Sequence, residues 1–153
     1  MFGAMSRAAR RALLTVHVVA SVGLLGVIAV DLAINVNATT TGDPEVAAAS
    51  YDLLATFSFL FGIPLSFTSL GTGVLLGRSS KWGVVRHNWV ATKLVLNVSV
   101  ILVGALVLGP GVDAMRNGDG GAESALIAGS AWDLLALTLA TTLGVFKPRL
   151  GRR

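Results

Sequence analysis

Apolar residues are gathered along the chain into four long runs that are separated by short polar segments. The runs cover about residues 12–34, 47–77, 88–109 and 124–146. Each is about 20 residues or longer, which is the length that a helix needs to cross the roughly 30 Å apolar core of a bilayer. The pattern predicts an all-α polytopic membrane protein, in which four antiparallel transmembrane helices with short connections form an up-down bundle.

Prolines and glycines mark the expected boundaries and irregularities of these helices. Pro44 predicts a helix start, because proline is favoured at the first helical position. Pro64 lies near the middle of the second run and removes a backbone donor, which predicts a kink. The Gly109–Gly111 segment, Gly-Pro-Gly, predicts the end of the third helix. Polar loops are expected at residues 36–45 and 112–122.

The composition supports a membrane environment and excludes several kinds of chemistry. Hydrophobic residues make up 54% of the chain, charged residues 13%, and the mean hydropathy is +0.76. We therefore expect a single integral membrane domain over residues 1–153. The chain has no cysteine, so it can form no disulfide, thiolate metal site, iron–sulfur cluster or thioether-linked haem.

Basic residues predict the orientation of the helices, because they collect beside one set of connections. Arg116 and most acidic residues lie beside the other set. We therefore expect both termini in the cytoplasm and the protein in the cytoplasmic membrane, with the lipid bilayer as a partner and no nucleic acid. The ten basic residues on the predicted cytoplasmic side are Arg7, Arg10, Arg11, Arg78, Lys81, Arg86, Lys147, Arg149, Arg152 and Arg153.

Small residues recur at intervals of three and four in the second and fourth runs, and such stripes let helix backbones approach closely in lipid. We expect both stripes to pack within the bundle, on a protein partner, or on a second copy of the chain. The stripes are Ser58, Gly62, Ser66, Ser69, Gly73 and Gly77, and Gly129, Asp133, Ala136, Ala140 and Gly144.

Five polar residues inside the runs are candidates for function. His17 and Lys93 each lie five residues into a run, so they share a depth near the predicted cytoplasmic surface. Asp31, Asn97 and Asp133 are predicted to form a buried polar network with Lys93, because an ionisable side chain that faces lipid costs several kcal/mol. The alternative for Lys93 is that its long side chain extends its ammonium group to the headgroups.

Two short motifs resemble a family of haem proteins. The segments "LLTVHVVASVGLLG" and "WVATKLVLN" are similar to the four-helix haem-binding membrane superfamily that includes bacterial haem-type protoporphyrinogen oxidases and the CopD proteins. His17 and Gly26 match its first-span motif, whereas Trp89, Lys93 and Leu94 match its third-span motif. Ala91 stands where that motif has a histidine.

The resemblance implies a b-type haem, with His17 as an iron ligand, His87 as a second ligand and Lys93 as a partner for a propionate. No other metal site is predicted. Over nearly its full length, the chain also resembles uncharacterised actinobacterial four-span predicted integral membrane proteins, which indicates a bacterial cytoplasmic membrane.

Three functions follow from these observations. The first is a small bundle without catalysis of its own, acting as an accessory or interaction subunit. The second is a b-type haem-binding membrane oxidoreductase. The third is a small proton-coupled or small-molecule carrier that acts as a dimer, using its intramembrane polar residues. Motifs typical of soluble enzymes, such as a phosphate-binding glycine loop, are not found.

Overall fold

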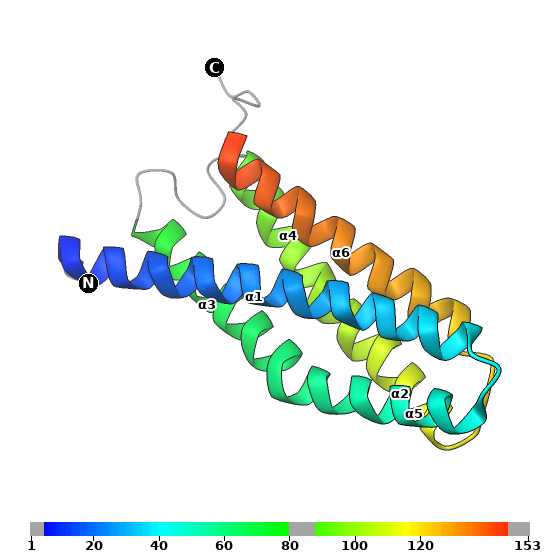
Figure 1. The fold of residues 1–153 in the computed structure, drawn as a ribbon. Coiled ribbons are helices and arrows are strands. Elements are labelled where there is room, and N and C mark those ends of the chain that lie inside the picture. Colours follow the sequence, from blue (N-terminus) through cyan, green and yellow to red (C-terminus); the bar gives the residue numbers. More distant parts are fainter. Residues whose placement is uncertain (1–4, 80–87, 147–153) are drawn as a thin grey trace.

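The computed structural model describes residues 5–79 and 88–146. All the secondary-structure elements in this part of the chain are helices. Four helical stretches, Arg7–Thr40, Pro44–Arg78, Asn88–Arg116 and Glu123–Phe146, are long and apolar enough to cross a membrane. They run alternately up and down (Figure 1). The predicted four-helix membrane bundle is therefore confirmed.

The first span is one continuous helix, α1, from Arg7 to Thr40. At 1.5 Å per residue its 34 residues extend about 51 Å, far more than the apolar core of a bilayer requires. At its end, the hydroxyl groups of Thr39 and Thr40 donate to the carbonyl of Val36. The backbone N–H of Thr41 still donates to the Asn37 carbonyl, so the helix continues through the segment where a loop was predicted from residue 36 and leaves only residues 41–43 as the connection.

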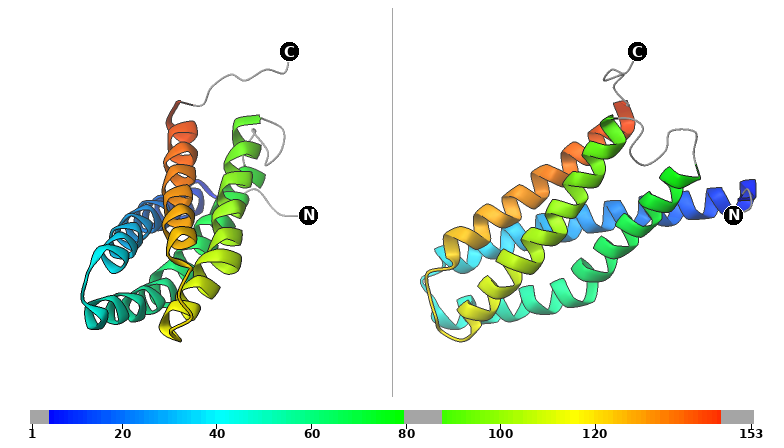
Figure 2. Two further views of the ribbon diagram at one scale, coloured as in Figure 1. Left: turned by 90° about the vertical axis from the view of Figure 1, so that its right-hand side faces the viewer. Right: turned by 180° about the vertical axis from the view of Figure 1, so that it is seen from behind.

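The second span is divided by a π-helical turn. It consists of α2 (Pro44–Phe57), the π turn η1 (Ser58–Gly62) and α3 (Ile63–Arg78). The start predicted at Pro44 is confirmed, and the Asp43 carboxylate caps it by accepting from two backbone N–H groups. In the wider turn, the N–H of Ile63 donates to the Ser58 carbonyl, just before Pro64, which has no N–H to donate. Figure 2 shows the bend between α2 and α3.

The third span repeats this arrangement, as α4 (Asn88–Val103), the π turn η2 (Gly104–Leu108) and α5 (Gly109–Arg116). The prediction that Gly109–Gly111 ends the helix was wrong. The N–H of Gly109 donates to the Gly104 carbonyl, so the chain widens by one residue before Pro110 and continues for two more turns. The loop that follows covers residues 117–122 rather than 112–122.

The fourth span, α6 (Glu123–Phe146), packs against α1 on one side and α4 on the other. Two apolar clusters hold the bundle together. One, here called the central cluster, joins α1, α4 and α6, and the other lies nearer the loops at residues 41–43 and 117–122. Their buried members are Leu24, Ile28, Val100, Ala136 and Leu137 in the first, and Ala38, Tyr51, Leu54, Val112 and Leu126 in the second.

The two ends of the bundle differ in packing and in charge. Helices α1 and α3 separate from α4 and α6 toward the end where α1 begins and α6 ends (Figures 1 and 2). This basic end carries Arg7, Arg10, Arg11, Arg78 and Lys93. The opposite, acidic end carries Asp43, Glu45, Asp52, Asp113, Asp119 and Glu123, together with Arg116.

Candidate functional site

Two aspartates lie at one level inside the bundle, where α1 contacts α6. The Asn35 side-chain amide donates to the Ser130 hydroxyl at 2.9 Å, which fixes the register of these antiparallel helices. Asp31 and Asp133 lie four and three residues from this bond, both toward the basic end, and so at nearly the same depth. Only 5% of Asp31 and 1% of Asp133 is exposed. We call Asp31, Asn35, Ser130 and Asp133 the carboxylate level.

The carboxylate level lies well below the surface of the membrane-spanning part. Asp31 lies ten residues before the Thr41 cap of α1, and Asp133 lies ten residues after the start of α6 at Glu123. At 1.5 Å per residue, both are about 15 Å from the acidic ends of their helices. Neither side chain can therefore extend to water at the helix ends.

Four buried oxygen atoms in this half of the bundle have no hydrogen-bond partner among the described residues. They are Oδ1 of Asp31, Asn35 and Asp133, and the hydroxyl oxygen of Tyr51 on α2. Buried polar atoms are nearly always hydrogen-bonded, and three of these oxygens, on Asp31, Asn35 and Asp133, belong to the carboxylate level. A carboxyl group that carries a proton becomes a donor, and the Asn35 side-chain oxygen, one turn from Asp31 on the same helix, is suited to accept it.

No cation of the described chain lies at the carboxylate level. Arg116 is at the acidic end, where its Nε donates to Asp52 at 2.7 Å and its guanidinium lies 3.8 Å from Asp113. Taking an unpaired carboxylate out of water costs several kcal/mol even after relaxation. The geometry therefore favours neutral, protonated carboxyl groups at Asp31 and Asp133.

Lys93 lies elsewhere than the predicted network requires. Its Nζ is 2.8 Å from the point that a Cβ on Gly144 would occupy. The contact of Gly129 with Val103 puts position 93 level with about residue 139, so the Lys93 side chain extends toward the basic end to reach Gly144. Gly144 is 11 residues from Asp133, about 16 Å along α6. The structure thus does not bring the Lys93 ammonium to the aspartates.

The Lys93 ammonium lies where the dipole of α6 favours a positive charge. Gly144 lies toward the carboxyl end of α6, and a helix favours a cation at that end because its peptide dipoles give it partial negative charge. Asn97 is half-buried one turn after Lys93, and its amide donates to the Lys93 carbonyl at 2.9 Å. Asn97 is therefore bonded within α4 rather than to the carboxylate level.

His17 is held by α3 near the basic end. Its Nδ1 lies 3.1 Å from the Ser69 carbonyl oxygen and 3.0 Å from the Thr72 hydroxyl, and its ring packs on Gly73. Since a carbonyl oxygen only accepts, Nδ1 carries the proton, and in the neutral ring Nε2 keeps the lone pair. Next to it, the Ser21 and Ser69 hydroxyl groups bond at 2.8 Å.

These residues provide part of what a haem would need. The bond from Nδ1 to a backbone carbonyl orients His17 as metal-ligating histidines are oriented. The second ligand that the resemblance implied, His87, lies outside the described residues, and position 91 is an alanine half-buried on α4. The described residues therefore offer one imidazole, that of His17, and not the two axial histidine ligands that the resemblance implied.

The central cluster separates the two polar regions. It fills the interval between the carboxylate level and the level of His17. On the other side, the second apolar cluster, with Ala38, Leu54 and Leu126 among its buried members, lies between the carboxylate level and the acidic end. The carboxylate level is thus closed by apolar side chains in both directions.

Sequence reasoning identified the two aspartates but not all of their surroundings. Ser130 and Tyr51 were missed, because neither a serine in a small-residue stripe nor a tyrosine near a loop is unusual. The four-residue interval from Asp31 to Asn35 does predict a shared helix face. The three-residue interval from Ser130 to Asp133 likewise predicts a shared face on α6.

The helices and their buried polar residues define an integral membrane protein with four spans. Residues 11–147 match the model of the family described as "Predicted integral membrane protein (DUF2269)", and the chain belongs to this family. No curated protein and no solved structure matches the chain.

Proposed function

We propose that this protein is a small proton-coupled membrane protein without catalytic chemistry of its own, in which Asp31 and Asp133 bind and release the coupling proton. One observation supports the proposal above all: two nearly fully buried carboxyl groups share one level of the bundle with no cation of the described chain beside them. Ionisable residues in this setting are characteristic of proton relays and transport pathways.

The surroundings of the aspartates support a binding site rather than an open channel. Apolar side chains lie on both sides of the carboxylate level, Leu24 and Leu137 toward the basic end and Leu54 and Leu126 toward the acidic end. Transfer of a proton to the basic end therefore requires the central cluster to rearrange.

The accessory role and the dimeric state that the sequence suggested remain predictions and are compatible with this proposal. A proton-binding bundle can act on a partner subunit or pair with a second copy. The haem alternative is checked by the absorption spectrum of the purified protein, oxidised and reduced with dithionite. We expect no Soret band, and a Soret band that is lost in His17→Ala would replace the proposal with a haem protein.

The direct test is proton movement into liposomes that contain the purified protein, measured with an enclosed pH-sensitive dye under a potassium diffusion potential. We expect uptake above that of empty liposomes, and its loss when Asp31→Asn and Asp133→Asn are combined. The control is Asp119→Asn, which removes an exposed carboxylate from a loop and should leave uptake unchanged. Equal uptake by the double variant and the original protein would exclude the aspartates.

A further inference from the structure

Arginines gather at the basic end, whereas the acidic residues of the chain lie elsewhere. All eight acidic residues of the chain lie in its described part. Six of them are at the acidic end, and the other two are Asp31 and Asp133 at the carboxylate level. The basic end therefore contains no acidic side chain that could pair with Arg7, Arg10, Arg11 or Arg78.

The helices at the basic end are also the least covered part of the bundle. No residue of α1 before Ala20 and no residue of α4 before Val100 is buried, within the described range. The pair α1 and α3 separates from the pair α4 and α6 toward this end (Figures 1 and 2). Apolar side chains such as Val16, Val19 and Val95 are exposed there, as is suitable for contact with acyl chains.

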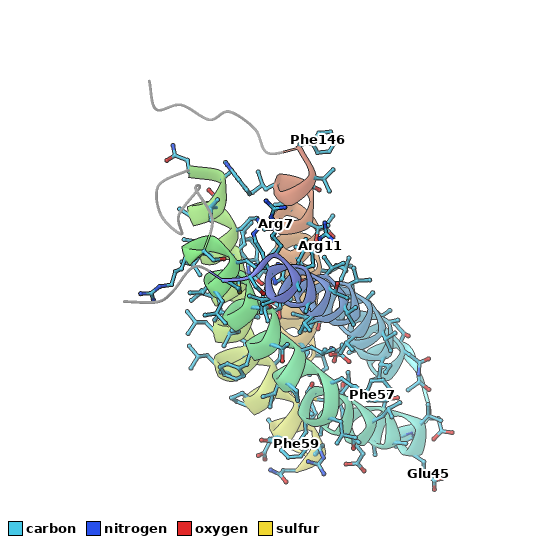
Figure 3. The ribbon with its side chains drawn as sticks, turned by 90° about the vertical axis from the view of Figure 1, so that its left-hand side faces the viewer. Arg7, Arg11, Glu45, Phe57, Phe59 and Phe146 are labelled. Carbon is cyan, nitrogen blue, oxygen red and sulfur yellow. The ribbon has the colours of Figure 1, made fainter. Side chains whose placement is uncertain are left out.

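Three arginines extend this surface beyond the apolar run. Helix α1 begins five residues before the run at residue 12, so Arg7, Arg10 and Arg11 lie on its first turns, just outside the apolar run. Figure 3 shows Arg7 and Arg11 projecting from the same side of α1, in the direction in which Phe146 lies. The Lys93 ammonium, against Gly144, is directed to the same end of α6.

We infer that the basic end binds an anionic phospholipid, with its acyl chains along the separated helix pairs and its phosphate contacted by the arginines of α1 and by Lys93. Exposed cations, uncovered apolar helix faces and a half-buried lysine all meet at this end. A phosphate with attached acyl chains satisfies all three features together, which neither a free phosphate nor an uncharged lipid does. This inference does not depend on the proposed function.

The test uses the full-length protein in mild detergent, supplied with mixed micelles of phosphatidylglycerol and phosphatidylcholine. Native mass spectrometry measures which lipid stays bound, and thermal unfolding measures the stabilisation that each lipid gives. We expect phosphatidylglycerol to be retained preferentially. Each basic residue near an anionic surface strengthens attraction about fivefold. Combining Arg7→Gln, Arg10→Gln and Arg11→Gln should therefore weaken retention by up to about a hundredfold.

Arg116→Gln is the control, because it removes a cation from the acidic end, and it should keep the preference for phosphatidylglycerol. A second variant, Lys93→Met, should also reduce the preference if it folds, whereas the three exposed arginines can be changed without disturbing the core. Equal retention of both lipids by the unaltered protein would overturn the inference. The same holds if the preference survives in the triple variant, or if inorganic phosphate stabilises the protein as strongly as the lipid does.

Discussion

The carboxylate level and the basic end both place ionisable residues inside the predicted membrane spans, but they do so in opposite ways. Asp31 and Asp133 are buried, lie about 15 Å from the helix ends, and have oxygens without donors. Lys93 and His17 are half-buried, and each lies over a glycine of a neighbouring helix. Depth alone therefore does not define a functional residue in a membrane. What matters is whether the surrounding chain or the headgroup layer satisfies its charge.

The largest difference between the two regions should appear in their reactivity with an apolar carbodiimide, which attacks protonated carboxyl groups. We expect mass spectrometry to find the adduct on Asp31 or Asp133 and not on the exposed Asp119. The combined variant Asp31→Asn and Asp133→Asn should lose the adduct completely. Labelling that is confined to carboxylates of the acidic end would contradict a protonated carboxylate level.

The central cluster should matter more for stability than any residue of the basic end. Leu24 is 1% exposed and packs in this cluster, so Leu24→Ala leaves a cavity. We expect it to lower the free energy of unfolding by about 2–5 kcal/mol. Thermal or denaturant unfolding in detergent measures this. The exposed Val19→Ala serves as the control, and an equal loss in both variants would show that the cluster is not the core of the bundle.

Two glycines allow a matched comparison of packing at the two regions. A Cβ at Gly129, next to Ser130, would lie 2.8 Å from Leu108 and 3.3 Å from Val103, whereas a Cβ at Gly144 would meet only the movable end of Lys93. We expect Gly129→Ala to cost about 1–3 kcal/mol of stability. Gly144→Ala should cost no more than about 0.5 kcal/mol. If unfolding showed the reverse order, the carboxylate level could not be the tightly packed region.

The smallest effect is expected for the ion pair at the surface of the acidic end. The Arg116 and Asp52 side chains bond at 2.7 Å but are 43% and 66% exposed. Arg116→Gln should therefore lower stability by only about 0.2–1 kcal/mol, and less at high salt. A larger loss that does not depend on salt would mean that this pair is shielded from solvent in the membrane.

The sequence predicted the number and order of the spans, because hydrophobic runs of this length have few other structures. It did not predict that the third helix continues past Pro110. The i to i−5 bond of Gly109 accommodates that proline, and such a bond depends on the local geometry of a turn rather than on residue type.

The candidate site was predicted only in part, for a related reason. Counting residues gave the depths of Asp31, Lys93 and Asp133, but not the direction of the Lys93 side chain, which decides whether Lys93 and Asp133 meet. The hydrogen bonds of His17 with α3 depend on how two distant segments pack. Neither feature follows from periodicity within one helix.

The central claim is that Asp31 and Asp133 hold a proton inside the membrane, and infrared spectroscopy tests it most directly. The protein in lipid at neutral pH should show the carbonyl stretching band of a protonated carboxylic acid, shifted in heavy water. We expect this band to be lost when Asp31→Asn and Asp133→Asn are combined, and to be kept in Asp119→Asn. Carboxylate bands alone in the unaltered protein would contradict the account, since both aspartates would then be ionised.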